Sequence, residues 1–220
     1  TLPQMARAAR DLGWEYLGIA DHSTAAAYAG GLSAEKLKEQ WREIDALNAR
    51  TQGFRLLKGT ECDILPDGAL DWPDAILAQC DYVVASVHSN FRLSEAEMTR
   101  RIIKALRNRH VTMLGHPTGR LLLAREPYPV DMLNVIQAAA DYGKVIEINA
   151  HPSRLDLDWR LCRHARDKGV LIAINPDAHT MDGLKDVRFG VGIARKGWLE
   201  RVHVLNAQRL PSVLEYLQIS

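Results

Sequence analysis

Five short apolar runs in this chain each end at a histidine or an acidic residue. An apolar run of this length is typical of a strand that is buried on both faces. In α/β barrels, the carboxyl ends of such strands carry the active-site residues. The runs therefore predict one shared pocket, whose members are Asp21 with His22, Glu61, His88, His116, and Asp177 with His179.

The order of the predicted elements indicates an α/β fold with a parallel sheet. Apolar runs predict six strands, over 14–20, 54–64, 81–87, 111–114, 144–149 and 170–174. Helical patterns alternate with them over 4–12, 36–49, 72–78, 94–108, 131–142, 158–168 and 181–194, and segments 198–204 and 211–217 finish the chain. A loop rich in small residues is predicted over 21–31. This alternation favours parallel strands joined by helices.

The amino terminus begins on a predicted helix. Thr1 suits the N-cap position, and Pro3 suits the first turn. A barrel that begins on a helix lacks its first strand, and a seventh strand upstream of Thr1 would complete it. We therefore expect residues 1–220 to form a single domain that is a fragment of a longer chain.

Composition excludes several classes of protein. The chain has 220 residues, 47% of them hydrophobic, and a net charge of +1, which argues against a purely electrostatic DNA binder but not against a nuclease with a local basic rim. The odd number of cysteines, Cys62, Cys80 and Cys162, predicts buried free thiols and a reducing, cytoplasmic compartment. No apolar run approaches the length of a membrane span, so we expect no membrane partner.

The residue types at the strand ends suit a transition metal. Imidazole and carboxylate ligands together favour Zn, Mn or Fe. Asp177 and His179 are alternate residues, so both can face one pocket. The carboxylate of Glu61 can bridge two metal ions, and such pairs activate water in phosphodiester hydrolysis. Asp21 is a candidate for orienting the ring of His22.

Other polar residues have two readings each. A lone histidine is usually structural, and this reading suits His110, His164 and His203, whereas His151 is a weaker site candidate. Arg120 and Arg154 are candidates for contacting phosphate beside Asn149, with a structural salt bridge as the alternative. A basic helix is favoured as a solvated face over a nucleic-acid rim, and it contains Arg100, Arg101, Lys104, Arg107 and Arg109.

The strand-end motifs resemble the polymerase and histidinol phosphatase (PHP) superfamily. The matching segments are Ile19-Ala20-Asp21-His22-Ser23, Gly59-Thr60-Glu61, Ser86-Val87-His88-Ser89, Gly115-His116-Pro117 and Asp177-Ala178-His179. The resemblance implies a distorted, TIM-like (β/α) barrel of seven strands that holds up to three metal ions. The family's opening His-x-His motif is absent from the sequence and is expected just before Thr1.

A finer resemblance is to the PHP domain at the carboxyl end of bacterial family X DNA polymerases. It rests on the segments 115–122, 147–157 and 194–199. It implies a manganese-dependent 3′→5′ exonuclease that acts on DNA 3′ ends, attached to upstream polymerase domains. By the family pattern, Glu61 bridges two ions, Mn or Zn. Asp177 holds the first ion, His88 and His116 the second, and His22 and His179 the third.

Three functions stay open from the sequence. The first is a metal-dependent phosphoesterase of DNA 3′ ends, with Glu61 and Asp177 as catalytic residues and Arg120, Arg154 and Asn149 contacting substrate. The second is a small-molecule phosphomonoesterase of the histidinol-phosphatase type. The third is a non-catalytic module of a polymerase, although six retained ligand-type residues argue against a decayed site.

Overall fold

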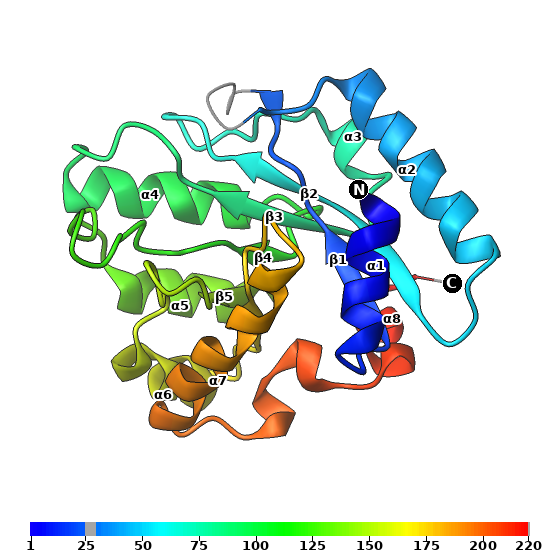
Figure 1. Cartoon of the computed structure of the whole chain (residues 1–220). Coiled ribbons are helices and arrows are strands. Elements are labelled where there is room, and N and C mark those ends of the chain that lie inside the picture. Colours follow the sequence, from blue (N-terminus) through cyan, green and yellow to red (C-terminus); the bar gives the residue numbers. More distant parts are fainter. Residues whose placement is uncertain (25–29, 220) are drawn as a thin grey trace.

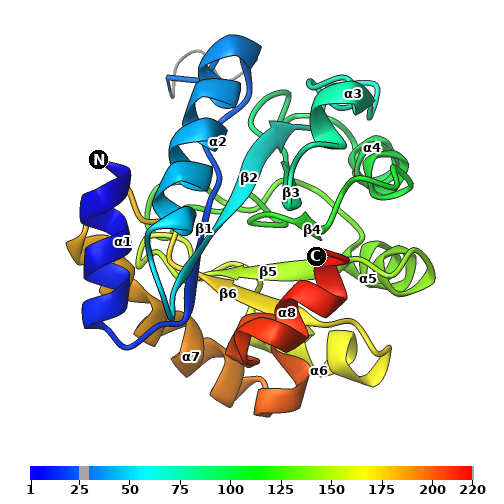
Figure 2. The ribbon, with the colours of Figure 1, turned by 90° about the vertical axis from the view of Figure 1, so that its right-hand side faces the viewer.

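The computed structural model describes residues 1–24 and 30–219 and contains one curled sheet. All six strands are parallel and lie in chain order. They are β1 (Tyr16–Ile19), β2 (Arg55–Asp63), β3 (Tyr82–Ser86), β4 (Met113–Leu114), β5 (Val145–Asn149) and β6 (Ile172–Asn175). The sheet curves into an arc with helices on its outer side (Figure 2), so the predicted α/β, TIM-like architecture is confirmed.

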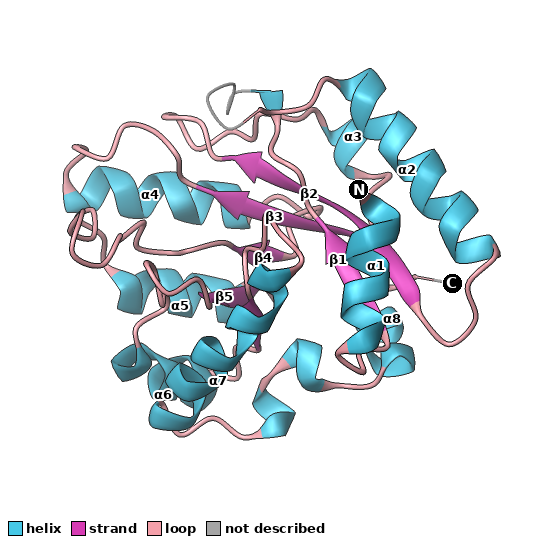
Figure 3. Ribbon diagram, in the orientation of Figure 1, coloured by secondary structure: helices cyan, strands magenta, loops and turns pink. Residues whose placement is uncertain are grey.

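The helices also lie where helical patterns and segments were expected. They are α1 (Leu2–Asp11), α2 (Ala34–Ala49), α3 (Asp74–Leu77), α4 (Glu95–Leu106), α5 (Met132–Asp141), α6 (Trp159–Asp167), α7 (Val187–Lys196) and α8 (Leu210–Leu217). Their arrangement around the sheet is visible in Figures 1 and 3. Short 3-10 turns occupy Arg201–His203, within the segment 198–204, and Leu205–Ala207 after it. The predicted loop over 21–31 includes residues 25–29, which lie outside the described residues.

Helix starts follow capping chemistry. The hydroxyl of Ser94 accepts a hydrogen bond from the backbone of Glu97, and the carboxylate of Glu97 returns to the backbone of Ser94, which is a capping box at the start of α4. Asp131 and Asp158 accept backbone hydrogen bonds at the starts of α5 and α6. These caps satisfy amide groups that a helix leaves unpaired in its first turn.

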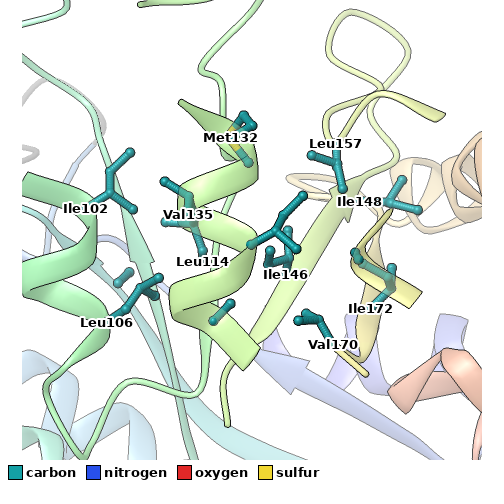
Figure 4. Close-up of a cluster of buried hydrophobic side chains, with 14 of the residues drawn as sticks. Ile102, Leu106, Leu114, Met132, Val135, Ile146, Ile148, Leu157, Val170 and Ile172 are labelled. Atoms are coloured by element: carbon teal, nitrogen blue, oxygen red, sulfur yellow. The ribbon is translucent and has the colours of Figure 1, made fainter. Parts of the chain in front are cut away.

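The outer face of the sheet packs against the helices to form the main core. Side chains of β4, β5 and β6 form one buried cluster with side chains of α4 and α5, and Figure 4 shows part of it. Leu114, Ile146, Ile148 and Ile172 are each fully buried there. Alternate residues of the same strands point to the inner face of the sheet and pack in a second cluster. Both faces of the sheet are therefore covered. This explains why the strands read as continuous apolar runs.

The inner face of the sheet forms a second, smaller core. Leu57, Val84, Met113, Val145 and Ala173 point into the curl, where Val213 of α8 packs against them. Farther along the same faces, toward the carboxyl ends of the strands, polar side chains replace these apolar ones. A cavity of about 1110 Å³ runs along this interior, lined by residues of both edge strands, β1 and β6, and by several strand-end side chains. The interior of the curl is therefore apolar near the amino ends of the strands and polar at their carboxyl ends.

Among the described residues, no helix combines the length and the apolar character needed to cross a membrane. The expectation that the basic helix is a solvated face is wrong for Arg101, which is 3% exposed. Its guanidinium donates to the carbonyl groups of Leu65 and Ser89 and also contacts that of Ile64. Arg101 therefore ties α4 to the segments that follow β2 and β3.

Candidate metal centre

The strand register brings distant ligand-type residues together. β1 and β2 pair with Ile19 opposite Lys58, and the same register three residues later places His22 opposite Glu61. β3 and β4 pair with Ala85 opposite Leu114, so His88 and His116 follow neighbouring strands. Parallel strands end at the same edge of the sheet. The residues that follow them in sequence therefore meet there.

Four predicted ligands form one cluster at this edge. The Nε2 atoms of His88 and His116 lie 3.1 Å apart. Oε1 of Glu61 lies 3.0 Å from Nε2 of His116 and 3.2 Å from Nε2 of His88. On the other side of the carboxylate, Oε2 of Glu61 lies 3.3 Å from Nδ1 of His22. The two oxygens of Glu61 therefore face different imidazole groups.

The spacing of these atoms fits a metal ion. Ligand atoms bound to one ion at about 2.0–2.2 Å are separated by about 2.8–3.1 Å in octahedral and about 3.3–3.6 Å in tetrahedral geometry. The three edges between Glu61, His88 and His116 are 3.0, 3.1 and 3.2 Å. Ligand atoms of His22, Glu61 and His88 also lie within 4.8 Å of one another. The donor set of nitrogen and carboxylate oxygen suits a divalent transition metal.

Two acidic residues that the sequence analysis did not assign stand behind the cluster. Asp63 contacts Nδ1 of His88, on the side of the ring away from Glu61. Glu147 accepts a hydrogen bond of 2.6 Å from the backbone of His116 and one of 2.8 Å from Asn175. The alternation of side chains along a strand could have found both, since Asp63 shares a face with Glu61 and Glu147 with Asn149.

Burial and close contacts shift the pKa values in the cluster. Burial alone would raise the pKa of Glu61, but hydrogen bonds with His116 and His88 hold it well below its usual range. Burial alone would lower the pKa of His88, but the carboxylates of Asp63 and Glu61 raise it to about 9. Burial is the main reason that the pKa of Glu147 rises to about 7. The cluster thus holds an ionised carboxylate at its centre.

A second polar group lies at the ends of β5 and β6. Oδ2 of Asp177 accepts a hydrogen bond of 3.0 Å from the amide of Asn149 and lies 3.8 Å from Nε of Arg154. The Nη1 atom of Arg154 is buried and has no hydrogen-bond partner among the described residues. The ring of His179 lies beside the backbone carbonyl of Asp177, with its side chain 73% exposed. Glu61, Asn149, Asp177 and His179 all line the cavity inside the curl.

The two arginine candidates have different surroundings. Arg120 forms a 2.8 Å ion pair with Asp158, donates to the carbonyl of Arg154 and contacts that of Leu155. Its guanidinium therefore fixes the loop after β5, as the salt-bridge alternative predicts. Arg154 keeps an unpartnered nitrogen and faces Asp177. The structure thus distinguishes two residues that the sequence left equivalent.

The remaining candidates lie outside the cluster or beside it. The carboxylate of Asp21 accepts a 2.5 Å hydrogen bond from Gln40 of α2, whereas Asp63 holds the orienting position on His88. The exposed ring of His151 contacts the hydroxyl of Ser153 at 2.7 Å. Nδ1 of His203 accepts a hydrogen bond from the backbone of Glu200, which is a structural role.

The comparisons with known proteins agree with this geometry. No protein-family model matches the chain. The chain is 45% identical over 218 residues to the DNA polymerase/3′-5′ exonuclease PolX of Bacillus subtilis. The aligned region covers 99% of this chain. It spans only 38% of the length of that protein. It is also 30% identical to a probable phosphatase of Acetivibrio thermocellus over 81% of this chain and 73% of that protein.

A solved structure shows the same fold. It is the histidinol phosphate phosphatase of Lactococcus lactis, in complex with zinc, L-histidinol and phosphate. The TM-score is 0.61 at 13% identity, with 91% of this chain and 88% of that chain covered. The sequence motifs, the curled sheet and these relatives lead to one conclusion. The chain belongs to the polymerase and histidinol phosphatase (PHP) superfamily of metal-dependent phosphoesterases.

Proposed function

We propose that this chain is a metal-dependent exonuclease domain that removes nucleotides from DNA 3′ ends as part of a family X polymerase. The observation that carries the proposal is the position of Glu61. Its Oε1 atom faces His88 and His116, and its Oε2 atom faces His22. A carboxylate placed in this way can bridge two ions. Paired ions are the usual catalysts of phosphodiester hydrolysis without a covalent enzyme intermediate.

Each ligand has a proposed role in the centre. His88 and His116 would hold one ion together with Glu61, which lies within 3.2 Å of both rings. Asp177, His22 and His179 would hold the further ions. Bound ions would supply a hydroxide from water and positive charge beside the phosphate. Asp63 contacts Nδ1 of His88, which leaves Nε2 on the side of Glu61, where it would be available to an ion.

The substrate phosphate is proposed to lie beside Arg154 and Asn149. Arg154 has a buried nitrogen without a partner, and its Nε lies 3.8 Å from Asp177. A guanidinium offers a fork that matches two phosphate oxygens. Arg120, whose guanidinium is bound to Asp158, would act by holding the loop that carries Arg154.

The proposal is tested by digestion of labelled DNA. The protein in its full natural chain is incubated with 5′-labelled single-stranded and gapped DNA, with manganese, with zinc and with chelator. We expect manganese-dependent shortening from the 3′ end that Glu61→Gln abolishes and His164→Ala leaves within a few-fold. DNA that stays intact under all metal conditions would contradict the proposal.

A small-molecule phosphomonoesterase is the second candidate. The shared fold with a histidinol phosphate phosphatase and the net charge of +1 favour it. Release of phosphate from small phosphomonoesters, with no shortening of DNA, would support this function. Inactivity on both substrate classes, with metal bound, would instead favour a structural module of a polymerase.

A further inference from the structure

The loop after β4 presents an unusual leucine to solvent. Leu123 has a relative exposure of 109%, and its backbone has φ of 63°. This left-handed conformation is disfavoured for a leucine and is normally adopted by glycine or asparagine. Leu122 beside it is also exposed. The two side chains form an apolar tip at the end of this loop.

The tip is held by a rigid turn. The backbone of Leu121 and that of Arg125 exchange hydrogen bonds of 2.8 and 2.7 Å, which close the turn around the tip. The amide of Leu122 donates to the carbonyl of Ser153 at 2.6 Å. This bond attaches the tip to the loop after β5, which also carries Arg154. The two leucines are therefore presented in a fixed place.

Aromatic packing supports the base of the turn. The guanidinium of Arg125 donates to the carbonyl of Gly119 and lies over the ring of Phe91, 4.4 Å from its centroid. Phe91 stacks on buried Tyr128, whose hydroxyl donates to the carbonyl of Pro117. Gly119 has φ of 62° and lies so close to Tyr128 that a Cβ would meet its ring at 2.5 Å. The base of the turn is therefore close-packed.

The tip lies on the metal-bearing edge of the sheet. It follows His116 in the loop after β4, and the amide of Gly119 donates to the carbonyl of His116 at 2.9 Å. The strand arrows in Figure 3 point toward the side where the loops after the strands emerge. The guanidinium of Arg125 brings positive charge to the base of the tip. An apolar tip beside a cationic group, on the edge of the sheet that carries the proposed metal centre, suits a nucleic-acid end.

We propose that Leu122 and Leu123 form a wedge that contacts the terminal base pair of duplex DNA and separates the 3′ strand for entry into the metal centre. This inference rests on the proposed exonuclease function. Proteins that distort DNA insert leucine and similar apolar side chains between base steps. A strand must be unpaired before its end can reach a buried centre, so the wedge determines the preference for duplex ends and takes no part in the hydrolysis.

The variant Leu123→Gly tests the wedge without straining the fold, because glycine readily adopts the conformation at this position. The full natural chain is assayed with manganese on a blunt duplex, on the labelled single strand and on bis(4-nitrophenyl) phosphate. We expect about a tenfold loss of the rate on duplex, from a lost contribution to unstacking. Rates on the single strand and on the small diester should remain within twofold of the parent, an estimate for a change outside the metal centre.

Trp198→Gly is the matched control. Trp198 is also an exposed apolar residue with positive φ, 73% exposed at φ of 61°, but it lies in the segment after α7, which carries none of the proposed metal ligands. The Trp198→Gly substitution should leave the rates on the duplex, the single strand and the small diester unchanged. In a Glu61→Gln background, 2-aminopurine at the duplex 3′ end should be brighter with the parent than with Leu123→Gly, because unstacking raises its fluorescence.

Three results would overturn the wedge. The first is equal duplex digestion by Leu123→Gly and the parent. The second is a parallel loss on bis(4-nitrophenyl) phosphate, which would place the effect in the metal centre. The third is unchanged digestion together with a changed sedimentation coefficient, which would make the tip a protein contact. If the parent digests no DNA at all, the proposed function fails, and the wedge fails with it.

Discussion

The Nε2 atoms of His88 and His116 lie 3.1 Å apart, although the residues are 28 positions apart in the sequence. Two imidazole nitrogens at this distance, both close to Oε1 of Glu61, are separated as two ligands of one ion are. Asp63 and Glu147 hold the two histidines from behind, one through a ring nitrogen and the other through the backbone. The centre is therefore positioned by its surroundings as well as by its ligands.

Replacing Glu61 with alanine should abolish hydrolysis and reduce the metal content. The carboxylate is the group that faces both sets of imidazole nitrogens, so its loss removes the bridge between two ions. The check is turnover of a phosphodiester together with bound metal measured by mass spectrometry. Unchanged turnover would contradict the metal mechanism.

Replacing Asp63 with asparagine should weaken metal binding by about 10–100-fold, as expected for the partner of a ligating histidine. Asp63 contacts Nδ1 of His88, and both side chains are nearly buried, at 6% and 7% exposure. Isothermal titration with manganese and with zinc measures the effect. Asp67→Asn is the control, because that carboxylate is 66% exposed and pairs with Lys104. An equal effect of both variants would exclude a specific role for Asp63.

Metal affinity of the metal-free protein should rise with pH up to about 9. The pKa of His88 is about 9, because Asp63 and Glu61 outweigh the opposite effect of burial. An ion binds only the neutral imidazole, so protons compete with it below this pH. Each unit of increasing pH below 9 should tighten binding by up to about tenfold, and the gain should cease above it. Titration of manganese at several pH values gives the slope, and an affinity that is flat from pH 6 to 9 would contradict the expectation.

Replacing Asp158 with asparagine should destabilise the fold by about 1–3 kcal/mol at neutral pH. Asp158 caps α6 and pairs with Arg120 and Arg160. Partial burial alone would raise its pKa, but hydrogen bonds from Arg160 and Arg120 hold it far below its usual range. A lowered carboxyl pKa contributes stability above its unfolded value of about 3.9, and this is lost as the pH falls through the folded value. The difference between variant and parent in urea unfolding should thus be constant from pH 5 to 7 and shrink below about 4.

The sequence alone determined the strands and the edge at which the ligands meet. Six apolar runs became the six strands within about two residues, because strands buried on both faces must be apolar throughout. His22, Glu61, His88 and His116 followed from their places after these runs. Parallel strands bring such positions to one edge whatever the details of packing.

Only the tertiary structure decided which polar side chains support the centre. Strand alternation puts Asp63 and Glu147 on the inner face, but which histidine each supports depends on the register with neighbouring strands. Arg120 and Arg154 looked equivalent in the sequence, but one pairs with Asp158 while the other faces Asp177. Arg101 belonged to an apparently solvated face, yet three carbonyl groups surround its guanidinium. Local pattern fixes secondary structure, whereas the partner of a charged side chain depends on contacts between segments that are remote in the chain.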